Sequence, residues 1–161
     1  MKRSRTITWN DPMEGAKEAM KMDGIAYLQA MSDHKLPLPP LLYTLDFSVS
    51  LIEAGNVVFE FTPQEFHYNP IGTVHGGVIT AILDSAMGCS VHSLLPAGKG
   101  YTTLELKVNF LKAITIKTGK LKTLGKVISL GGRTALVEAQ LLDENNAVYA
   151  HAVSTCLILK S

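Results

Sequence analysis

The sequence predicts an α+β domain in which an antiparallel sheet packs on, and curls round, one long helix. Three observations carry this prediction: an apolar helical stretch begins at His75, segments of alternating apolar and polar residues lie on both sides of it, and the elements follow the order helix, two strands, long helix, four strands. Antiparallel sheets commonly pack one face on helices and leave the other in solvent. We expect residues 1–40 to form a helical extension with a proline-rich connector, and residues 41–161 to form the main domain.

The composition limits the classes of partner. A chain of 161 residues that is 47% hydrophobic and 18% charged can bury a substantial core. Its formal net charge is +1 and it has no run of Lys or Arg, so no nucleic acid partner is expected. The basic opening Met1–Arg5 is not followed by the apolar core of a secretion signal, and the apolar helix is too often interrupted by polar residues to span a membrane. We therefore expect a cytoplasmic protein, without a membrane partner, that binds small molecules and itself.

Residues 12–33 predict a helix, because their apolar residues recur at helical spacing. Asp23 and Gly24 weaken this helix, and residues 37–40, Pro-Leu-Pro-Pro, end it and form a stiff connector. Methionine is frequent here, at Met13, Met20, Met22 and Met31. Thioethers adapt to variable apolar ligands, but we favour plain packing of this helix against the domain over a lid on a ligand.

Alternation predicts the strands. Before the central helix, apolar and polar residues alternate over 45–51 and 57–61, with a turn between them. After it, strands are expected at 102–111, 119–130, 133–143 and 147–159. The last three are separated by Gly131-Gly132 and by Asp143-Glu144-Asn145-Asn146, both typical turn sequences.

The central helix is predicted from His75 to Cys89, and its apolar residues point in almost every direction. Such a helix should be buried. Asp84 is the exception, because a carboxylate inside a buried helix is costly unless it is paired, hydrogen-bonded or open to a cleft. Two explanations stay open: a functional site, or an aspartate satisfied by neighbouring hydroxyls such as those of Ser85 or Thr80.

The start of this helix offers a second reactive feature. The amides of Gly76 and Gly77 lie at the positive end of the helix dipole and could polarise a carbonyl oxygen. At a rise of about 1.5 Å per residue, Asp84 lies about 12 Å further along the same helix. If both groups act on one carbonyl, two copies of the chain must share the site.

These residues resemble a known family. The segment Asn69–Gly77 with Asp84, followed by residues 104–110 and 132–134, closely resembles the hotdog-fold acyl-CoA thioesterases, most of all the branch named for the phenylacetate-pathway thioesterase. The resemblance covers roughly residues 40–159. It implies a hotdog fold, here with an extra N-terminal helix, and subunits paired as a homodimer or homotetramer with active sites between them. It also implies hydrolysis of an acyl-CoA thioester; an acyl-thioester dehydratase or hydratase, and a non-catalytic acyl-CoA-binding protein, are the alternatives.

The resemblance implies roles for individual residues. Asp84 matches the catalytic carboxylate, which acts as general base toward water or as nucleophile on the thioester carbonyl. The backbone N–H of Gly77 or Gly76 matches the donor that holds the carbonyl oxygen as it gains charge. Asn69 matches a residue that orients water or the thioester and faces the partner's Asp84.

Two further positions are less uniquely determined. Thr103 matches a hydroxyl that helps to place the water, but a shift of one residue would select Thr102, and strand alternation sends the two to opposite faces. His75 could serve as a catalytic acid or base. At a helix entrance, however, we favour a histidine that hydrogen-bonds the local backbone and fixes the loop.

For the coenzyme A end of the substrate, the tight turn Gly131-Gly132 with Arg133 is the candidate, together with Gly76 at the helix start. Glycine lets the backbone approach a phosphate, and guanidinium pairs with phosphate bidentately. The alternative is an ordinary hairpin with a solvated arginine. Three lysines could contribute: Lys99, Lys120 and Lys122.

Metal and cofactor chemistry are not expected. The two cysteines, Cys89 and Cys156, are at core positions without metal spacing, and His34, His67 and His151 form no ligand pattern with carboxylates or thiols. The sequence also lacks a Gly-x-Ser-x-Gly elbow and a phosphate loop.

Overall fold

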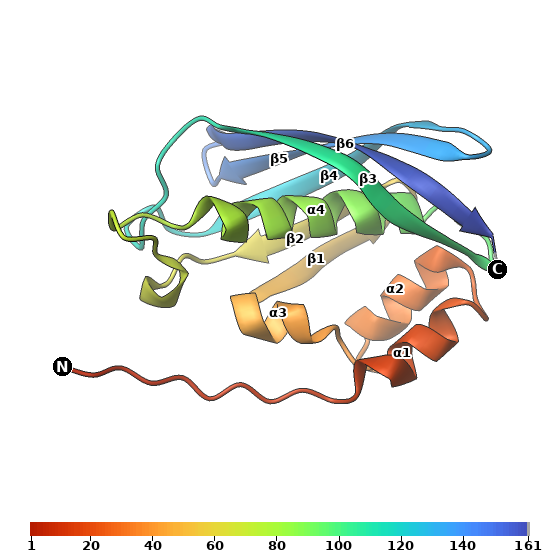
Figure 1. Ribbon diagram of the computed structural model, residues 1–161, viewed down its shortest axis with the longest axis horizontal. Helices are drawn as coiled ribbons and strands as arrows, with labels where there is room; N and C mark the ends of the chain where they lie inside the picture. The colour runs from red at the N-terminus through yellow and green to blue at the C-terminus, as the bar shows by residue number, and fades with distance from the viewer. Residues whose placement is uncertain (161) are drawn as a thin grey trace.

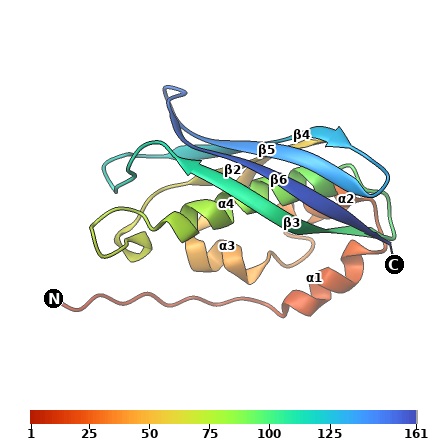
Figure 2. The ribbon, with the colours of Figure 1, turned by 45° about the horizontal axis from the view of Figure 1, so that its top comes forward.

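The computed structural model describes residues 1–160 as a curved sheet wrapped over one long helix, with short N-terminal helices beside them (Figures 1 and 2). The helices are α1 (Pro12–Ala19), α2 (Gly24–Ser32), α3 (Pro40–Leu45) and α4 (Gly76–His92), with a single 3-10 turn, η1, at Glu65–His67. The strands are β1 (Phe47–Glu53), β2 (Asn56–Phe61), β3 (Lys99–Phe110), β4 (Leu121–Leu130), β5 (Thr134–Asp143) and β6 (Val148–Lys160).

The strands form one sheet in the order β1-β2-β4-β5-β6-β3, and every neighbouring pair is antiparallel. Each strand lies within three residues of the bounds that alternation predicts. The predicted fold class is therefore confirmed. Because β1 and β3 are the first and last strands of this order, they form the two edges of the sheet, and β5 and β6 lie between β3 and its sequence neighbour β4.

Helix α4 supplies the centre of the core. The residues of α4 that face the sheet are fully buried, and they are Ile82, Leu83, Ala86, Met87 and Val91. The sheet does not close round the whole helix, and another group of α4 residues is only half-buried: Ala81, Asp84, Ser85 and Cys89. The expectation of burial on all sides is therefore wrong for this half-buried side of α4.

Gly125 sets how closely α4 approaches β4. A Cβ atom at this position would lie 2.4 Å from the carbonyl oxygen of Ala86 and 2.6 Å from Oγ of Ser90. Neither the helix backbone nor the buried Ser90 can withdraw without opening the core, so only glycine fits here.

Substitution of Gly125 by alanine is expected to reduce the free energy of unfolding by about 1–3 kcal/mol, the usual cost of overpacking a core. Gly100 in β3 is the matched control, because a Cβ there meets nothing within 4 Å. Gly100→Ala should change the free energy by less than about 0.5 kcal/mol. Urea unfolding of both variants measures the difference, and equal stability of the two variants would contradict this reading of the helix contact.

The N-terminal helix predicted over residues 12–33 is two helices. The helix is interrupted between α1 and α2, where residues 23 and 24 contact the loop after α4. The amide of Gly24 donates to the carbonyl of Leu95 (2.9 Å), and the carboxylate of Asp23 accepts from the amide of Ala97 (3.0 Å). These contacts hold the start of α2 against the end of α4. Tertiary hydrogen bonds therefore interrupt the single helix that the periodicity predicts.

Helix α3 was not predicted. Its first residue is Pro40, a position where proline suits a helix because its missing N–H is not needed. It ends at Leu45, and the next residue, Asp46, caps it in the left-handed conformation with φ of 52°. A six-residue helix directly after the prolines leaves little periodicity to detect.

Candidate active site

Asp84 and Thr103 lie together on the half-buried side of α4. The hydroxyl of Thr103 on β3 donates a hydrogen bond to Oδ1 of Asp84 at 2.9 Å. The neighbouring Thr102 is exposed. Of the two threonines that the sequence left open, Thr103 is thus the one that reaches the carboxylate. Ser85 does not satisfy Asp84, because its hydroxyl donates to the carbonyl of Ala81 at 2.8 Å.

The start of α4 presents one free amide. The Nδ1 atom of His75 accepts a hydrogen bond from the amide of Gly77 at 2.8 Å, so His75 is the N-cap of the helix. Among residues 1–160, the amide of Gly76 has no such partner. A Cβ on Gly76 would lie 3.2 Å from the ring of Phe110, which leaves little room for a side chain. Of the two glycines, Gly76 is the one whose amide can bind a ligand oxygen.

Asn69 organises the loop before α4. Its Oδ1 accepts from the amides of Ile71 (3.0 Å) and Thr73 (3.1 Å), and its Nδ2 donates to Oγ1 of Thr73 (2.9 Å). An amide group carries two donor hydrogens, so one remains beyond the contact with Thr73. Asn69 thus fixes the loop and keeps one hydrogen for another group.

Asn69 and Gly76 line the same cavity of about 320 Å³. Its walls also include Phe110, the last residue of β3, and Lys112, two residues beyond it. Lys112 was missed by sequence reasoning, because a lone lysine just past a strand looks like any solvated residue. Its Nζ lies 5.3 Å from the centre of the Tyr149 ring.

The two groups of residues do not meet within one chain. We name Asn69 and Gly76 the amide half-site, and Asp84 and Thr103 the carboxylate half-site. The cavity at the amide half-site is lined by neither Asp84 nor Thr103. Asp84 lies eight residues after Gly76 on α4, which is about 12 Å along the helix, so a carbonyl bound by one half-site is out of reach of the other.

The turn at Gly131-Gly132 also lies away from the amide half-site. The carbonyl of Arg133 accepts from the amide of Ile158, which pairs with Tyr101 near the start of β3. Gly76 instead adjoins Phe110, at the end of β3. The structure therefore separates Arg133 and Gly76, two candidates for the coenzyme A contact, along the length of β3.

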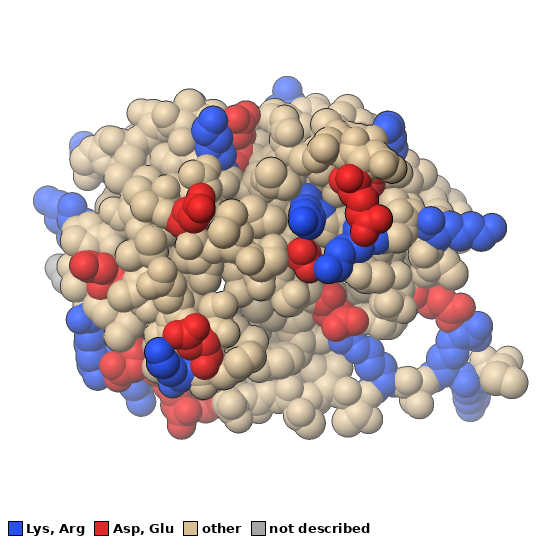
Figure 3. All heavy atoms as spheres, turned by 180° about the vertical axis from the view of Figure 1, so that it is seen from behind, with Lys and Arg blue, Asp and Glu red and all other residues tan. Residues whose placement is uncertain are grey.

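Two of the unassigned lysines are paired. Lys120 and Lys122 both face the carboxylate of Glu60, at 2.6 and 3.9 Å. On the face seen in Figure 3, Lys and Arg are interspersed with Asp and Glu, without a continuous field of one sign. Arg133, Lys112 and Lys99 have no ion-pair partner within residues 1–160, so they stay individual candidates for a contact with an anion.

The thiols are not suited to nucleophilic catalysis. Burial, and to a smaller extent the negative charge of Asp84, raise the pKa of Cys89 to about 12. Burial also raises the pKa of Cys156. Within residues 1–160, no three side chains of His, Cys, Asp or Glu are grouped to hold a metal ion.

His92, at the end of α4, is buried with neither ring nitrogen hydrogen-bonded within residues 1–160. Its ring packs against Tyr27 and Tyr101, with centroids 5.5 and 5.9 Å apart. Burial lowers the pKa of His92 below its usual 6.5, because the charged form loses its hydration.

Stability should therefore fall as the pH is lowered through 6.5. The unfolded chain binds a proton at His92 more readily than the folded chain, so protonation favours unfolding, with a slope of up to about 1.4 kcal/mol per pH unit. Urea unfolding between pH 7.5 and 5.0 measures this slope for the wild type and for His92→Leu. The variant retains His67, whose pKa is also lowered by burial, so the difference between the two slopes isolates His92. Identical slopes would contradict the prediction.

None of the helices in residues 1–160 combines the length and apolar character needed to cross a bilayer.

Comparison with known proteins identifies the family. The model of the thioesterase superfamily matches residues 71–150. A protein of Saccharolobus solfataricus named "Putative esterase SSO2140" is 30% identical over 117 residues, which cover 73% of this chain and 81% of that protein. A phenylacetic acid degradation-related protein from Ralstonia eutropha, titled a "putative thioesterase", is 26% identical, with a TM-score of 0.74 over 81% of this chain and 98% of its own.

The fold is shared more widely than the sequence. The Escherichia coli PaaI protein, from the phenylacetic acid degradation operon, has a TM-score of 0.74 over 87% of this chain and 97% of its own at 16% identity. The resemblance seen in the sequence is thereby confirmed, and the chain belongs to the thioesterase superfamily and has its hotdog fold.

Proposed function

We propose that this protein hydrolyses acyl-CoA thioesters to a free acid and coenzyme A, at a site shared between two subunits. Membership of the superfamily supports a thioester hydrolase in general. The observation that carries the finer proposal is the division of the candidate site: one chain holds a free amide at Gly76 and a hydrogen-bonded carboxylate at Asp84, about 12 Å apart along α4. Two copies are needed to bring both groups to one carbonyl.

The chemistry follows from the groups in each half-site. The amide of Gly76, at the positive end of α4, holds the thioester oxygen as it gains negative charge. Asp84 acts on the carbonyl carbon, either by taking a proton from the attacking water or by attacking directly. In either case the carbon–sulfur bond breaks, the thiolate leaves and takes up a proton, and water supplies the second oxygen of the acid.

Thr103 and Asn69 are positioning residues in this proposal. The hydroxyl of Thr103 donates a hydrogen bond to Asp84, so the lone pairs of its oxygen are left to accept a hydrogen bond from the water. The second hydrogen on Nδ2 of Asn69 is available to the thioester or the water. His75 acts by holding the first turn of α4 in place, since its Nδ1 is occupied by Gly77.

The edge strand β3 supports pairing of two chains. It has 12 residues, and its outer side has no strand partner within residues 1–160. Two of its apolar side chains, Leu104 and Phe110, are 55% and 53% exposed. Long exposed edges of this kind invite pairing with another strand. Antiparallel pairing with a second β3 would set the end that adjoins Gly76 beside the partner's Thr103 end.

The same pairing would also bring the candidate contacts for coenzyme A close to the shared site. Arg133 lies near the start of β3, so it would approach the partner's amide half-site, where Lys112 lines the cavity. A guanidinium and an ammonium group at that position would meet the phosphates of coenzyme A. Arg133 and the amide half-site, which lie apart within one chain, would thus contact the same substrate when two chains pair.

Release of free thiol from a panel of acyl-CoAs, aromatic and aliphatic, tests the proposal. We expect release by the wild type, and a higher kcat/KM for the CoA thioester than for the same acyl group on N-acetylcysteamine, which lacks the phosphates. Absence of release from every thioester would overturn hydrolysis. Equal kcat/KM for the two thiol carriers would overturn recognition of coenzyme A.

A further inference from the structure

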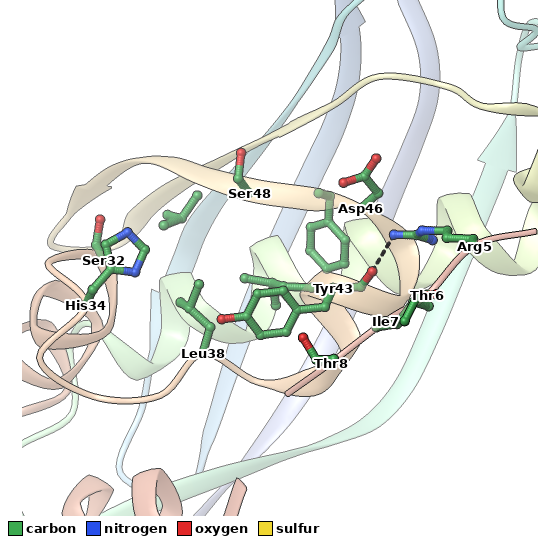
Figure 4. Close-up of a pocket in the computed structure, with 13 residues that line it drawn as sticks. Arg5, Thr6, Ile7, Thr8, Ser32, His34, Leu38, Tyr43, Asp46 and Ser48 are labelled. Carbon is green, nitrogen blue, oxygen red and sulfur yellow. Dashed lines mark hydrogen bonds between the residues drawn. The ribbon is translucent and has the colours of Figure 1, made fainter. Parts of the chain in front are cut away.

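The extended chain before α1 crosses a cavity of about 500 Å³ that lies beside α3 and β1 (Figure 4). We name residues 1–8 the N-terminal segment. Its residues Thr6, Ile7 and Thr8 line this cavity, and none of the three is fully buried. Apolar packing therefore contributes little to holding the N-terminal segment in place, and polar contacts must do so.

Arg5 attaches the N-terminal segment to α3. Its guanidinium donates hydrogen bonds to the carbonyls of Tyr43 (2.5 Å) and Thr44 (2.8 Å), in the last turn of the helix. The carbonyls of a last helical turn have no partner within the helix, so a guanidinium suits them. The same group lies over the ring of Phe66 in η1, 4.0 Å from its centre. Arg5 thus bridges α3 and η1.

His67 joins the same two elements from the inside. It is 2% exposed, and both of its ring nitrogens have partners: Nδ1 accepts from the amide of Gln64 at 2.9 Å, and Nε2 lies 2.9 Å from the carbonyl of Leu45, the last residue of α3. Because an amide N–H only donates and a carbonyl only accepts, the ring is neutral and carries its hydrogen on Nε2. A proton added to Nδ1 would face the hydrogen of the Gln64 amide and break this contact.

The backbone of His67 continues these contacts to the amide half-site. Its carbonyl accepts a hydrogen bond from the amide of His75 at 2.8 Å. His75 is the N-cap of α4, and the next residue is Gly76, which supplies the amide of the half-site. A continuous set of contacts therefore leads from Arg5, through the end of α3 and His67, to the residue before Gly76.

We propose that Arg5 and His67 are positioning residues of the active site, which together hold the amide of Gly76 where it meets the thioester oxygen. This inference rests on the proposed function, and it assigns part of that function to a segment outside residues 71–150, which the superfamily model matches. A misplacement of about 1 Å can lower a rate by about 100-fold, so even a loosened donor costs activity. Neither Arg5 nor His67 lines the cavity of the amide half-site, so substrate binding should change little.

The charge of Arg5 also influences the protonation of His67. Burial lowers the pKa of His67 below its usual 6.5; the hydrogen bond to the α3 carbonyl and the charge of Asp46 raise it, and the charge of Arg5 lowers it. The other ionic groups at η1, Arg3 and Glu65, pair with each other. Because the net shift is downward, the contacts of His67 are intact above its lowered pKa and are lost as the pH falls through it.

The kinetic test compares the two arginines of the N-terminal segment. Arg5→Ala should lower kcat for the best acyl-CoA about tenfold with KM unchanged, a smaller effect than the 10²–10³-fold loss of a whole oxyanion donor. Arg3 is the matched control, because its side chain is 70% exposed and pairs with the exposed Glu65 instead of α3. Exposed ion pairs contribute little, so Arg3→Ala should keep the wild-type kcat. Equal kcat in the two folded variants would overturn the proposal.

The pH profile distinguishes positioning from a general loss of structure. The wild-type kcat should fall as the pH is lowered through the pKa of His67. In Arg5→Ala this fall should move to higher pH, because the charge that lowers the pKa of His67 is gone. In His67→Gln it should be absent, since the amide of glutamine can donate to Leu45 but does not titrate. Coincident profiles of the wild type and both variants between pH 8 and 5 would overturn the proposal.

Amide hydrogen exchange, followed by NMR, separates this inference from the proposed function because it needs no substrate. The amide of His75 should exchange about tenfold faster in Arg5→Ala than in the wild type or Arg3→Ala, because its acceptor on His67 is held less firmly. The amide of Leu83, in the middle of α4, should exchange equally in all three. If no acyl-CoA is hydrolysed but this pattern holds, the proposed function fails and the connection from Arg5 to His75 stands. If acyl-CoAs are hydrolysed without the pattern, the positioning role fails alone.

Discussion

Replacement of Asp84 by asparagine is expected to lower kcat/KM for acyl-CoA hydrolysis by about 10²–10⁴-fold, the usual contribution of a positioned acid or base. Asparagine keeps the shape of the side chain and can still accept the hydrogen bond from Thr103, which is 2.9 Å away in the wild type. It can neither take a proton from water nor attack a carbonyl. Free-thiol release with the best substrate of the panel gives the two rates.

Two threonines supply the control for this prediction. Thr103→Val removes the donor to Asp84 and should lower kcat/KM, whereas Thr102→Val alters an exposed neighbour and should not. Circular dichroism and the unfolding midpoint verify that each variant is folded. Wild-type activity in folded Asp84→Asn would remove Asp84 from the mechanism.

Mixing two inactive variants is expected to restore activity. Asn69→Ala damages the amide half-site, and Asp84→Asn damages the carboxylate half-site. If each active site takes one half-site from each subunit, a mixed dimer contains one intact site and one site with both defects. Random re-association of equal amounts makes half of the dimers mixed, so about a quarter of the wild-type activity should return.

The control mixture pairs Asp84→Asn with Thr103→Val. Both changes lie in the carboxylate half-site of one chain, so no mixed dimer gains an intact site. The activity of this mixture should equal the average of its components. A lack of rescue in the first mixture, with mixed dimers verified by mass spectrometry, would show that the two half-sites do not form a shared active site.

The fold was largely predictable from the sequence, because its signals are local. Alternation located the six strands, and the apolar run from His75 located α4. The N-terminal region was predicted less well for the opposite reason. Gly24 donates a hydrogen bond to the loop after α4, and Asp23 accepts one from it. These contacts divide one periodic segment into two helices and leave no trace in local periodicity.

The separation of the candidate site into two half-sites was predictable from the sequence, but the state of the individual groups was not. The helical rise alone separates Gly76 from Asp84. Which glycine amide is free depends on the rotamer of His75, whose Nδ1 takes the amide of Gly77. The partial exposure of Asp84 depends on how far the sheet curves round α4, and no single segment of sequence encodes that curvature.

The strand order has a consequence for synthesis on the ribosome. Strand β3 is made before β4 and β5, yet its only partner within residues 1–160 is β6, with Phe110 paired to Ala150 and Lys99 to Lys160. At about 5–20 residues per second, roughly 3–10 s pass between translation of the end of β3 and the end of β6. During that interval both sides of β3 are unpaired. The nascent chain therefore offers chaperones a long strand, and the sheet can be completed only when β6 arrives.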